Sequence, residues 1–119
     1  HLKRLIKVRE MWKQYAKEYL GVTNYFENKI LGNYNQWFSD KEYRKRLSLL
    51  IGASFSDAGF SKMEGHATSS FDGKAFRGRT HKMNVLRRWV TFKGDEIFER
   101  VIADEALVEL SDKIFGKII

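Results

Sequence analysis

Six cationic side chains lie between Lys74 and Arg88, and no Asp or Glu interrupts them. They are Lys74, Arg77, Arg79, Lys82, Arg87 and Arg88. Lysine and arginine bind nucleic acids by displacing counterions from phosphates, which requires a localised positive surface rather than a short motif. Arg77 and Arg79 would share one face of a β-strand, because side chains alternate along a strand. The segment therefore predicts a phosphate-binding β-hairpin.

Two other groups of cations could extend this surface. One group lies in the N-terminal region and the other follows residue 40, and both regions have the spacing of helices. We expect a nucleic-acid-binding module in which the hairpin and the N-terminal helix contact the phosphate backbone of DNA or RNA. From these two groups, the residues added to the predicted interface are Lys7, Lys13, Lys17, Arg44 and Lys45.

The charge of the whole chain supports a polyanionic partner. Lysine and arginine total 22 against 15 aspartate and glutamate, a net charge of +7. Residues 1–50 carry 11 cations and 5 anions, whereas residues 104–119 carry 2 cations and 4 anions. Such an imbalance concerns partners and solubility rather than fold. An acidic protein surface would fit the charge equally well, so an adaptor or effector domain is the first alternative.

The histidines provide a second alternative, a metal-independent ribonuclease. Such an enzyme needs a general base, a general acid and a cation for the transition state, and no cofactor. His66 and His81 on neighbouring strands could supply the first two roles, with Glu64, Arg77 or Arg79 nearby. With three histidines and no cysteine, the sequence argues against a zinc site. It contains no GxxxxGK[ST], GxGxxG or GxSxG motif, so no motif names a reaction.

Length and composition indicate one domain. A chain of 119 residues fits a single core, since domains commonly have about 100–150 residues. The sequence has no apolar run of about 18 residues and no segment resembling a secretory signal, which predicts a soluble protein without a membrane span. The absence of cysteine also favours an intracellular location, cytoplasmic or nuclear. Because the chain begins with His1, it is compatible with being a segment of a longer protein.

The first half of the chain, residues 1–53, is predicted to contain about three helices. Apolar residues at Leu5, Val8, Trp12, Tyr15 and Tyr19 predict a helix over residues 2–20, with Gly21 after its end. Thr23 is the expected N-cap of a short helix to about residue 31. The tetrad at residues 39–42, Ser-Asp-Lys-Glu, has the form of a capping box and predicts a third helix to about residue 51 or 53.

The second half is predicted to be mainly β-structure, over residues 60–103. Asp72-Gly73 is a strong signal for a hairpin turn between strands at about 63–71 and 74–80. A second hairpin would place its turn at Lys93-Gly94-Asp95, between residues 83–92 and 96–103. A final helix over residues 104–116 would begin at Asp104. The predicted class is thus α+β, with a four-stranded antiparallel sheet of two hairpins.

Overall fold

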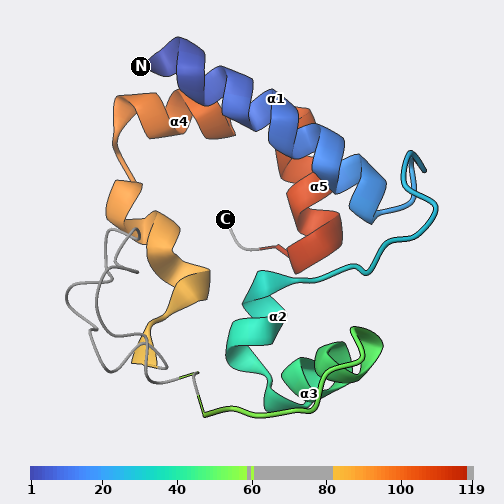
Figure 1. Ribbon diagram of the computed structural model, residues 1–119. Helices are drawn as coiled ribbons and strands as arrows, with labels where there is room; N and C mark the ends of the chain where they lie inside the picture. The colour runs from blue at the N-terminus through green and yellow to red at the C-terminus, as the bar shows by residue number, and fades with distance from the viewer. Residues whose placement is uncertain (59, 61–81, 118–119) are drawn as a thin grey trace. The chain divides into compact units, whose positions relative to one another are not determined.

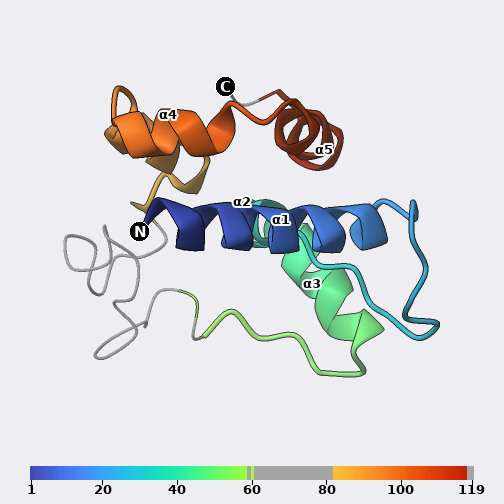
Figure 2. The same cartoon turned by 90° about the horizontal axis from the view of Figure 1, so that it is seen from above.

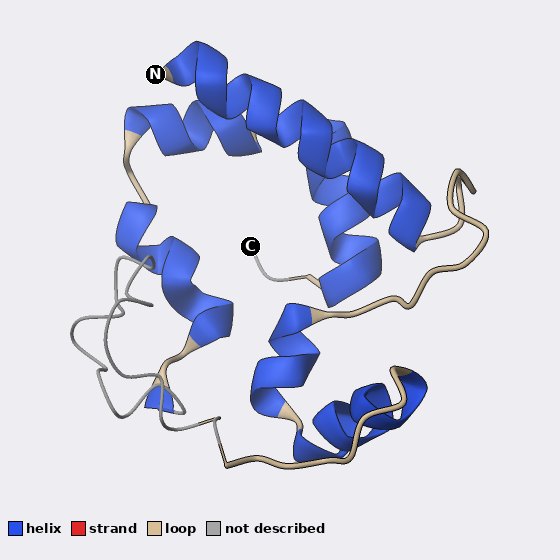
Figure 3. Cartoon of the chain, in the orientation of Figure 1, coloured by secondary structure: helices blue, strands red, loops and turns tan. Residues whose placement is uncertain are grey.

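The computed structural model describes residues 1–58, 60 and 82–117 of the chain (Figure 1). Within these residues the chain forms helices and no strand (Figure 3). The helices are α1 (Leu2–Tyr19), α2 (Tyr34–Ser39), α3 (Lys41–Leu50), the 3₁₀-helix η2 (Val85–Phe92), α4 (Glu96–Ile102) and α5 (Glu105–Phe115). The predicted α+β class is therefore wrong for the described residues, which are helical. The first predicted hairpin lies outside them.

The chain divides into two compact units. Unit 1 contains residues 1–31 and 88–119, and unit 2 contains residues 32–87. Helices α1, α4 and α5 belong to unit 1, whereas α2 and α3 belong to unit 2. None of the helices in the described ranges has the combination of length and apolarity needed to cross a membrane.

In unit 1, α1 packs against both α4 and α5 (Figure 2). The side of α1 that packs inward contains Leu5, Trp12 and Ala16, of which Ala16 is only 3% exposed. The predicted inward face was rotated relative to this one, since Val8 and Tyr15 are 48% and 64% exposed. The small side chain of Ala16 lets a neighbouring helix approach closely. Ala16 was not among the apolar residues from which the inward face was predicted.

The start of α5 binds α1 through one carboxylate. Asp104 caps α5 by accepting a hydrogen bond from the Leu107 amide at 2.8 Å. The same carboxylate accepts from Lys13 Nζ at 3.0 Å, and Arg9 Nη2 lies 3.4 Å away. The Leu107 amide, and then Lys13, lower the pKa of Asp104. The predicted helix starting at Asp104 is confirmed, and Gly116 follows it with a positive φ of 76°.

The predicted helix over residues 23–31 is wrong, because Glu18 holds that segment in an irregular loop. Glu18 is 7% exposed, and its carboxylate accepts hydrogen bonds from the amides of Tyr25 and Phe26 at 3.1 and 3.0 Å. It also accepts from the Thr23 hydroxyl at 2.7 Å and from Lys29 Nζ at 2.8 Å. These are amides that a first helical turn starting at Thr23 would leave without partners. Because the Glu18 carboxylate on α1 accepts hydrogen bonds from these amides, they need neither a cap at Thr23 nor a helix that begins there.

The second predicted hairpin is also wrong. Residues 85–92 form η2, and Asp95 caps α4 by accepting from the Phe98 amide at 2.8 Å. Gly94 has a positive φ of 85°, as the turn prediction required, and its amide donates to Glu99 at 3.1 Å. A glycine in a turn followed by an aspartate, as in Gly94-Asp95, can precede a helix as readily as a strand, because the aspartate can cap the helix. The spacing of Phe98, Val101 and Ile102 is helical, and it decides the outcome.

Unit 2 begins with two short helices joined at Asp40. Asn33 caps α2 by accepting from the Gln36 amide, and its own amide donates to Tyr43 Oη at 2.7 Å. The cap of α3 is Asp40, one residue after the predicted Ser39, and it accepts from the amides of Glu42 and Tyr43. Ser39 instead ends α2. The predicted third helix is present with this shifted start.

The Glu18 network predicts a loss of loop docking in acid. Its hydrogen bonds, that of Lys29 first, lower the pKa of Glu18 from 4.5 to about 2. A lowered folded-state pKa stabilises the loop fully above pH 4.5, and this stabilisation is lost as the pH falls toward 2. The protection factors of the Tyr25 and Phe26 amides, which correct for the intrinsic pH dependence of exchange, should therefore fall over this range.

At neutral pH, Glu18→Gln should reproduce the acid effect. The matched control is Glu27→Gln, which changes an exposed carboxylate in the same loop. Unchanged protection of the Tyr25 and Phe26 amides in Glu18→Gln would contradict the role given to Glu18.

Candidate functional site

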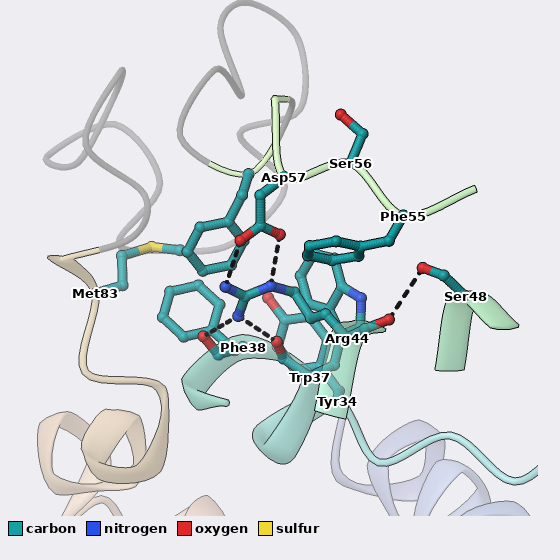
Figure 4. Close-up of a pocket in the computed structure, with 10 residues that line it drawn as sticks. Tyr34, Trp37, Phe38, Arg44, Ser48, Phe55, Ser56, Asp57 and Met83 are labelled. Carbon is teal, nitrogen blue, oxygen red and sulfur yellow. Dashed lines mark hydrogen bonds and ion pairs between the residues drawn. The ribbon is translucent and has the colours of Figure 1, made fainter. Parts of the chain in front are cut away.

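Unit 2 is centred on the guanidinium of Arg44, which is 8% exposed (Figure 4). Its Nε and Nη2 atoms donate to the two oxygens of Asp57 at 2.8 and 2.9 Å. Its Nη1 atom donates to the carbonyl oxygens of Trp37 and Phe38 at 2.8 and 3.2 Å. One side chain thus joins α3 to the last turn of α2 and to the segment that follows α3.

Local sequence explains this position. The last carbonyls of a helix have no partner within it and favour a nearby cation. Arg44 lies one turn into α3, where it can reach the carbonyl end of α2 across the Asp40 junction. The hydrogen bonds between Asp57 and Arg44 lower the pKa of the carboxyl and raise that of the guanidinium. The pair therefore stays ionised.

Aromatic rings lie around this ion pair and line a partly open pocket of about 240 Å³, here termed the aromatic pocket. The ring of Tyr34 stacks on that of Trp37, with centroids 6.0 Å apart and planes 16° apart. Phe60 meets Trp37 edge-on at 5.6 Å, and its ring centroid lies 3.9 Å from the Arg44 guanidinium carbon. The lining residues are Tyr34, Trp37, Phe38, Arg44, Ser48, Phe55, Ser56, Asp57, Phe60 and Met83 (Figure 4).

A second, more open depression of about 440 Å³ adjoins the aromatic pocket, since the two share Phe38, Arg44, Phe60 and Met83. We term it the basic depression. Its other lining residues are Ser39, Lys41, Lys82, Asn84, Val85 and Leu86. This lining contains three cations and no carboxylate. An anionic group placed there would meet positive charge without competition from the lining itself.

The residues of unit 2 that the sequence predicted as phosphate ligands separate into different environments. Lys82 is exposed and lines the basic depression, and Lys45 is exposed on α3. Arg44 is buried and bound to Asp57, so its role is mainly structural. Arg87 is exposed. The remaining predicted residues of this region, Lys74, Arg77 and Arg79, lie outside the described residues, as do His66 and His81.

The predicted ligands in unit 1 separate similarly. Lys7 is exposed on α1, and Lys17 is half-buried. Lys13 is bound to Asp104 and to Glu10, which lies 2.9 Å away. Arg88 is half-buried. Exposed cations that were not included in the prediction, Lys3 and Arg4, lie beside Lys7 at the start of α1.

Sequence reasoning missed Lys41 and Asn84 as possible contacts in the basic depression. Neither belongs to a motif, and residues 41 and 84 are brought together only by the fold of unit 2. The Arg44–Asp57 pair spans 13 positions, which no helical or strand spacing predicts. The sequence does indicate Tyr34 and Trp37 as candidate base-stacking rings, because aromatic rings near cations are typical of base-stacking sites.

Among the described residues, no group of three or more His, Cys, Asp or Glu side chains could hold a metal ion. Comparisons with protein-family models, curated proteins and solved structures find no match for this chain. The geometry and charge of the two units are therefore the basis for assigning a function.

The Arg44 network predicts that even a conservative change destabilises unit 2. Arg44→Lys keeps the charge but loses the planar fork that binds Asp57 and the two carbonyls. We expect the unfolding free energy of unit 2 to fall by about 2 kcal/mol, less than for a fully buried pair because Asp57 is partly open to water. Hydrogen exchange of the α2 and α3 amides measures this change.

Arg46→Lys is the matched control, because Arg46 is exposed on the same helix. It should change the stability of unit 2 by less than about 0.5 kcal/mol. If the two substitutions lower the unfolding free energy of unit 2 equally, the structural role given to the Arg44 network is contradicted.

Proposed function

We propose that this protein is a nucleic-acid-binding module that contacts phosphates through helical cations. The supporting observation is which cations of the two units are paired with carboxylates and which are exposed. Arg9, Lys13, Lys29 and Arg44 form ion pairs with carboxylates within their own unit. Other exposed cations gather in two places and form no ion pair there with a described carboxylate, whereas exposed Lys113 pairs with Glu109 at 2.7 Å.

The two places are defined by their residues. The α1 cluster consists of Lys3, Arg4 and Lys7, and the α3 cluster consists of Lys41, Lys45 and Arg46. Glu10, the acidic residue nearest the α1 cluster in sequence, is bound to Arg9 and Lys13. By contrast, residues 93–117 carry four cations among seven carboxylates.

Exposed cations of this kind supply the main term of non-specific nucleic-acid affinity. Each phosphate contact releases a condensed counterion, so affinity falls with salt in proportion to the number of contacts. A cation that is paired with a carboxylate of the protein is already neutralised. It therefore displaces fewer counterions from the phosphates of a nucleic acid. The proposal therefore assigns binding to the two clusters and to Lys82, and it leaves Lys13 and Arg44 as structural residues. An intracellular location, favoured by the absence of cysteine, belongs to this proposal.

Salt dependence tests the proposal directly. Binding of the wild type to short DNA and RNA should weaken as salt rises, with a slope of roughly −0.7 per contacted phosphate on single strands. Removing either cluster should make the slope shallower by up to about 2, because three contacts are lost. The two variants are Lys3→Ala with Arg4→Ala and Lys7→Ala, and Lys41→Ala with Lys45→Ala and Arg46→Ala.

The control removes the same net charge elsewhere, by Lys93→Ala, Arg100→Ala and Lys117→Ala. These cations are exposed but lie among the carboxylates of the C-terminal segment. The control should keep the wild-type slope. If it weakens binding as much as the cluster variants, net charge alone acts, and if the wild type does not bind near physiological salt, the proposal fails.

A second candidate is a module that binds an acidic protein surface. It is favoured by apolar side chains on the solvent side of α1, where Val8, Met11 and Tyr15 are 48%, 53% and 64% exposed. They share that side of the helix with Arg4 and Lys7, which is the mixture that an acidic amphipathic partner would match. The ribonuclease alternative depends on His66 and His81, outside the described residues.

This candidate predicts capture of a protein from nuclease-treated lysate. Replacing Met11 and Tyr15 by Ser should abolish capture, because the partner would bury both side chains. The matched control replaces Val22 and Tyr25, which are 68% and 78% exposed in the loop after α1, by Ser. Capture that survives the first variant, or is lost equally in both, would rule this candidate out.

A further inference from the structure

We infer that unit 2 binds one nucleotide of a single strand, with its base in the aromatic pocket and an adjoining phosphate in the basic depression. This inference deepens the proposed function and rests on it. Two features of unit 2 lead to it. One is the chemistry of the two hollows, and the other is that they share four lining residues and so lie side by side.

The aromatic pocket has the size and lining for a base. Its volume of about 240 Å³ is below the roughly 300–1,000 Å³ typical of whole-ligand pockets, so it fits part of a nucleotide. The Tyr34 side chain stacks on Trp37 and is 53% exposed, which leaves ring surface open to solvent. Open aromatic rings bind bases by stacking, and every base has a π-face.

The pocket also carries polar groups that could orient a base. Ser48 Oγ donates to the Arg44 carbonyl oxygen at 3.0 Å and keeps lone pairs that can accept. Ser56 Oγ accepts weakly from the Ala58 amide at 3.3 Å and keeps its hydroxyl proton to donate. Both oxygens of Asp57 retain acceptor capacity after bonding to Arg44. Groups that can donate and groups that can accept therefore both occur among the residues that line the pocket.

The basic depression supplies the complementary charge. Lys41, at the start of α3, and Lys82, which precedes η2, are both exposed and line the basic depression. Asn84 is exposed there and carries amide N–H donors. The charge of Arg44 is largely balanced by Asp57, so the two lysines carry the net positive charge of the lining. A phosphate bound between them would lie next to the shared wall of the aromatic pocket.

Together these features favour a single strand over a duplex. A base enters a pocket only when it is unstacked and unpaired, and removing it from a duplex costs free energy. The phosphates of a duplex would still contact exposed lysines but would leave the aromatic pocket unused. Single-strand preference is therefore the property that separates this inference from simple phosphate binding.

The experiment compares three fluorescein-labelled probes and one unlabelled competitor by anisotropy at one salt concentration. They are a single-stranded 12-mer, its duplex, an abasic 12-mer with the same phosphates and no bases, and an unlabelled mononucleotide as competitor. The wild type should bind the single strand about tenfold more tightly than the duplex or the abasic strand. The mononucleotide should compete only weakly, because it lacks the neighbouring phosphates.

Variants separate the two hollows. Tyr34→Ala should weaken single-strand binding roughly tenfold and leave abasic binding unchanged, whereas Tyr34→Phe should keep the wild-type affinity. Lys41→Ala with Lys82→Ala should weaken both and make the salt slope shallower by about 1.4. The controls are Tyr25→Ala and Lys93→Ala with Lys117→Ala, exposed residues outside unit 2. They should leave the single-strand preference intact.

Three results would overturn the inference. Equal affinity for single strand, duplex and abasic strand would do so while leaving the proposed function standing, since phosphates alone would be bound. A mononucleotide that competes as well as the 12-mer would show a free-nucleotide site instead. Absence of binding to every probe would overturn the inference and the proposed function together.

Discussion

Few large apolar side chains are buried in the described part of this protein, so charged side chains must hold its helices in place. The buried hydrophobic residues there are Ala16, Phe38, Met83 and Leu110. Three charged side chains, here termed ionic hubs, fix the positions of the helices and of one loop. Asp104 joins α5 to α1, and Glu18 binds the loop that follows α1. Arg44 joins α2, α3 and the segment after them. Each hub bonds to the backbone as well as to an opposite charge. Such bonds are directional, and they therefore select one arrangement of short helices that apolar contacts alone would specify poorly.

This use of charge also shapes the surface. Because each carboxylate hub binds a basic side chain of its own unit, those cations are neutralised, and the exposed cations lie elsewhere. The exposed cations of the α1 cluster lie at the start of α1, and those of the α3 cluster lie in the first two turns of α3. In unit 2 the same Arg44 network that fixes the helices also arranges the aromatic rings, because the guanidinium lies 3.9 Å from the Phe60 ring centroid and binds the Trp37 carbonyl. Our proposal thus gives Arg44 a structural role and assigns the phosphate contacts to its neighbours Lys41 and Lys82.

Where local signals decided the structure, the sequence predicted it. The helix from Asp104 to Gly116 was found because a capping aspartate, helical spacing and a final glycine agree, and Gly21 likewise ends α1 with φ of 75°. The second hairpin was wrong because Gly94-Asp95 serves a helix N-terminus as well as a turn. The helix at residues 23–31 failed because its amides are bound by Glu18, which precedes it in α1. The exposed basic character of Lys7, Lys45 and Lys82 was predictable from charge alone. The pairing of Arg44 with Asp57, which decides that Arg44 is structural, depends on tertiary contact and has no signal in spacing.

The central claim, that unit 2 receives a base in its aromatic pocket, is tested most directly by ultraviolet cross-linking. The protein would be irradiated with a single-stranded oligonucleotide, digested, and the cross-linked residues identified by mass spectrometry. Our account predicts cross-links at Tyr34 and at the rings beside it, Trp37 and Phe60. Cross-links confined to exposed rings of unit 1, such as Tyr15 and Tyr25, would contradict it, because strands would then bind away from the pocket.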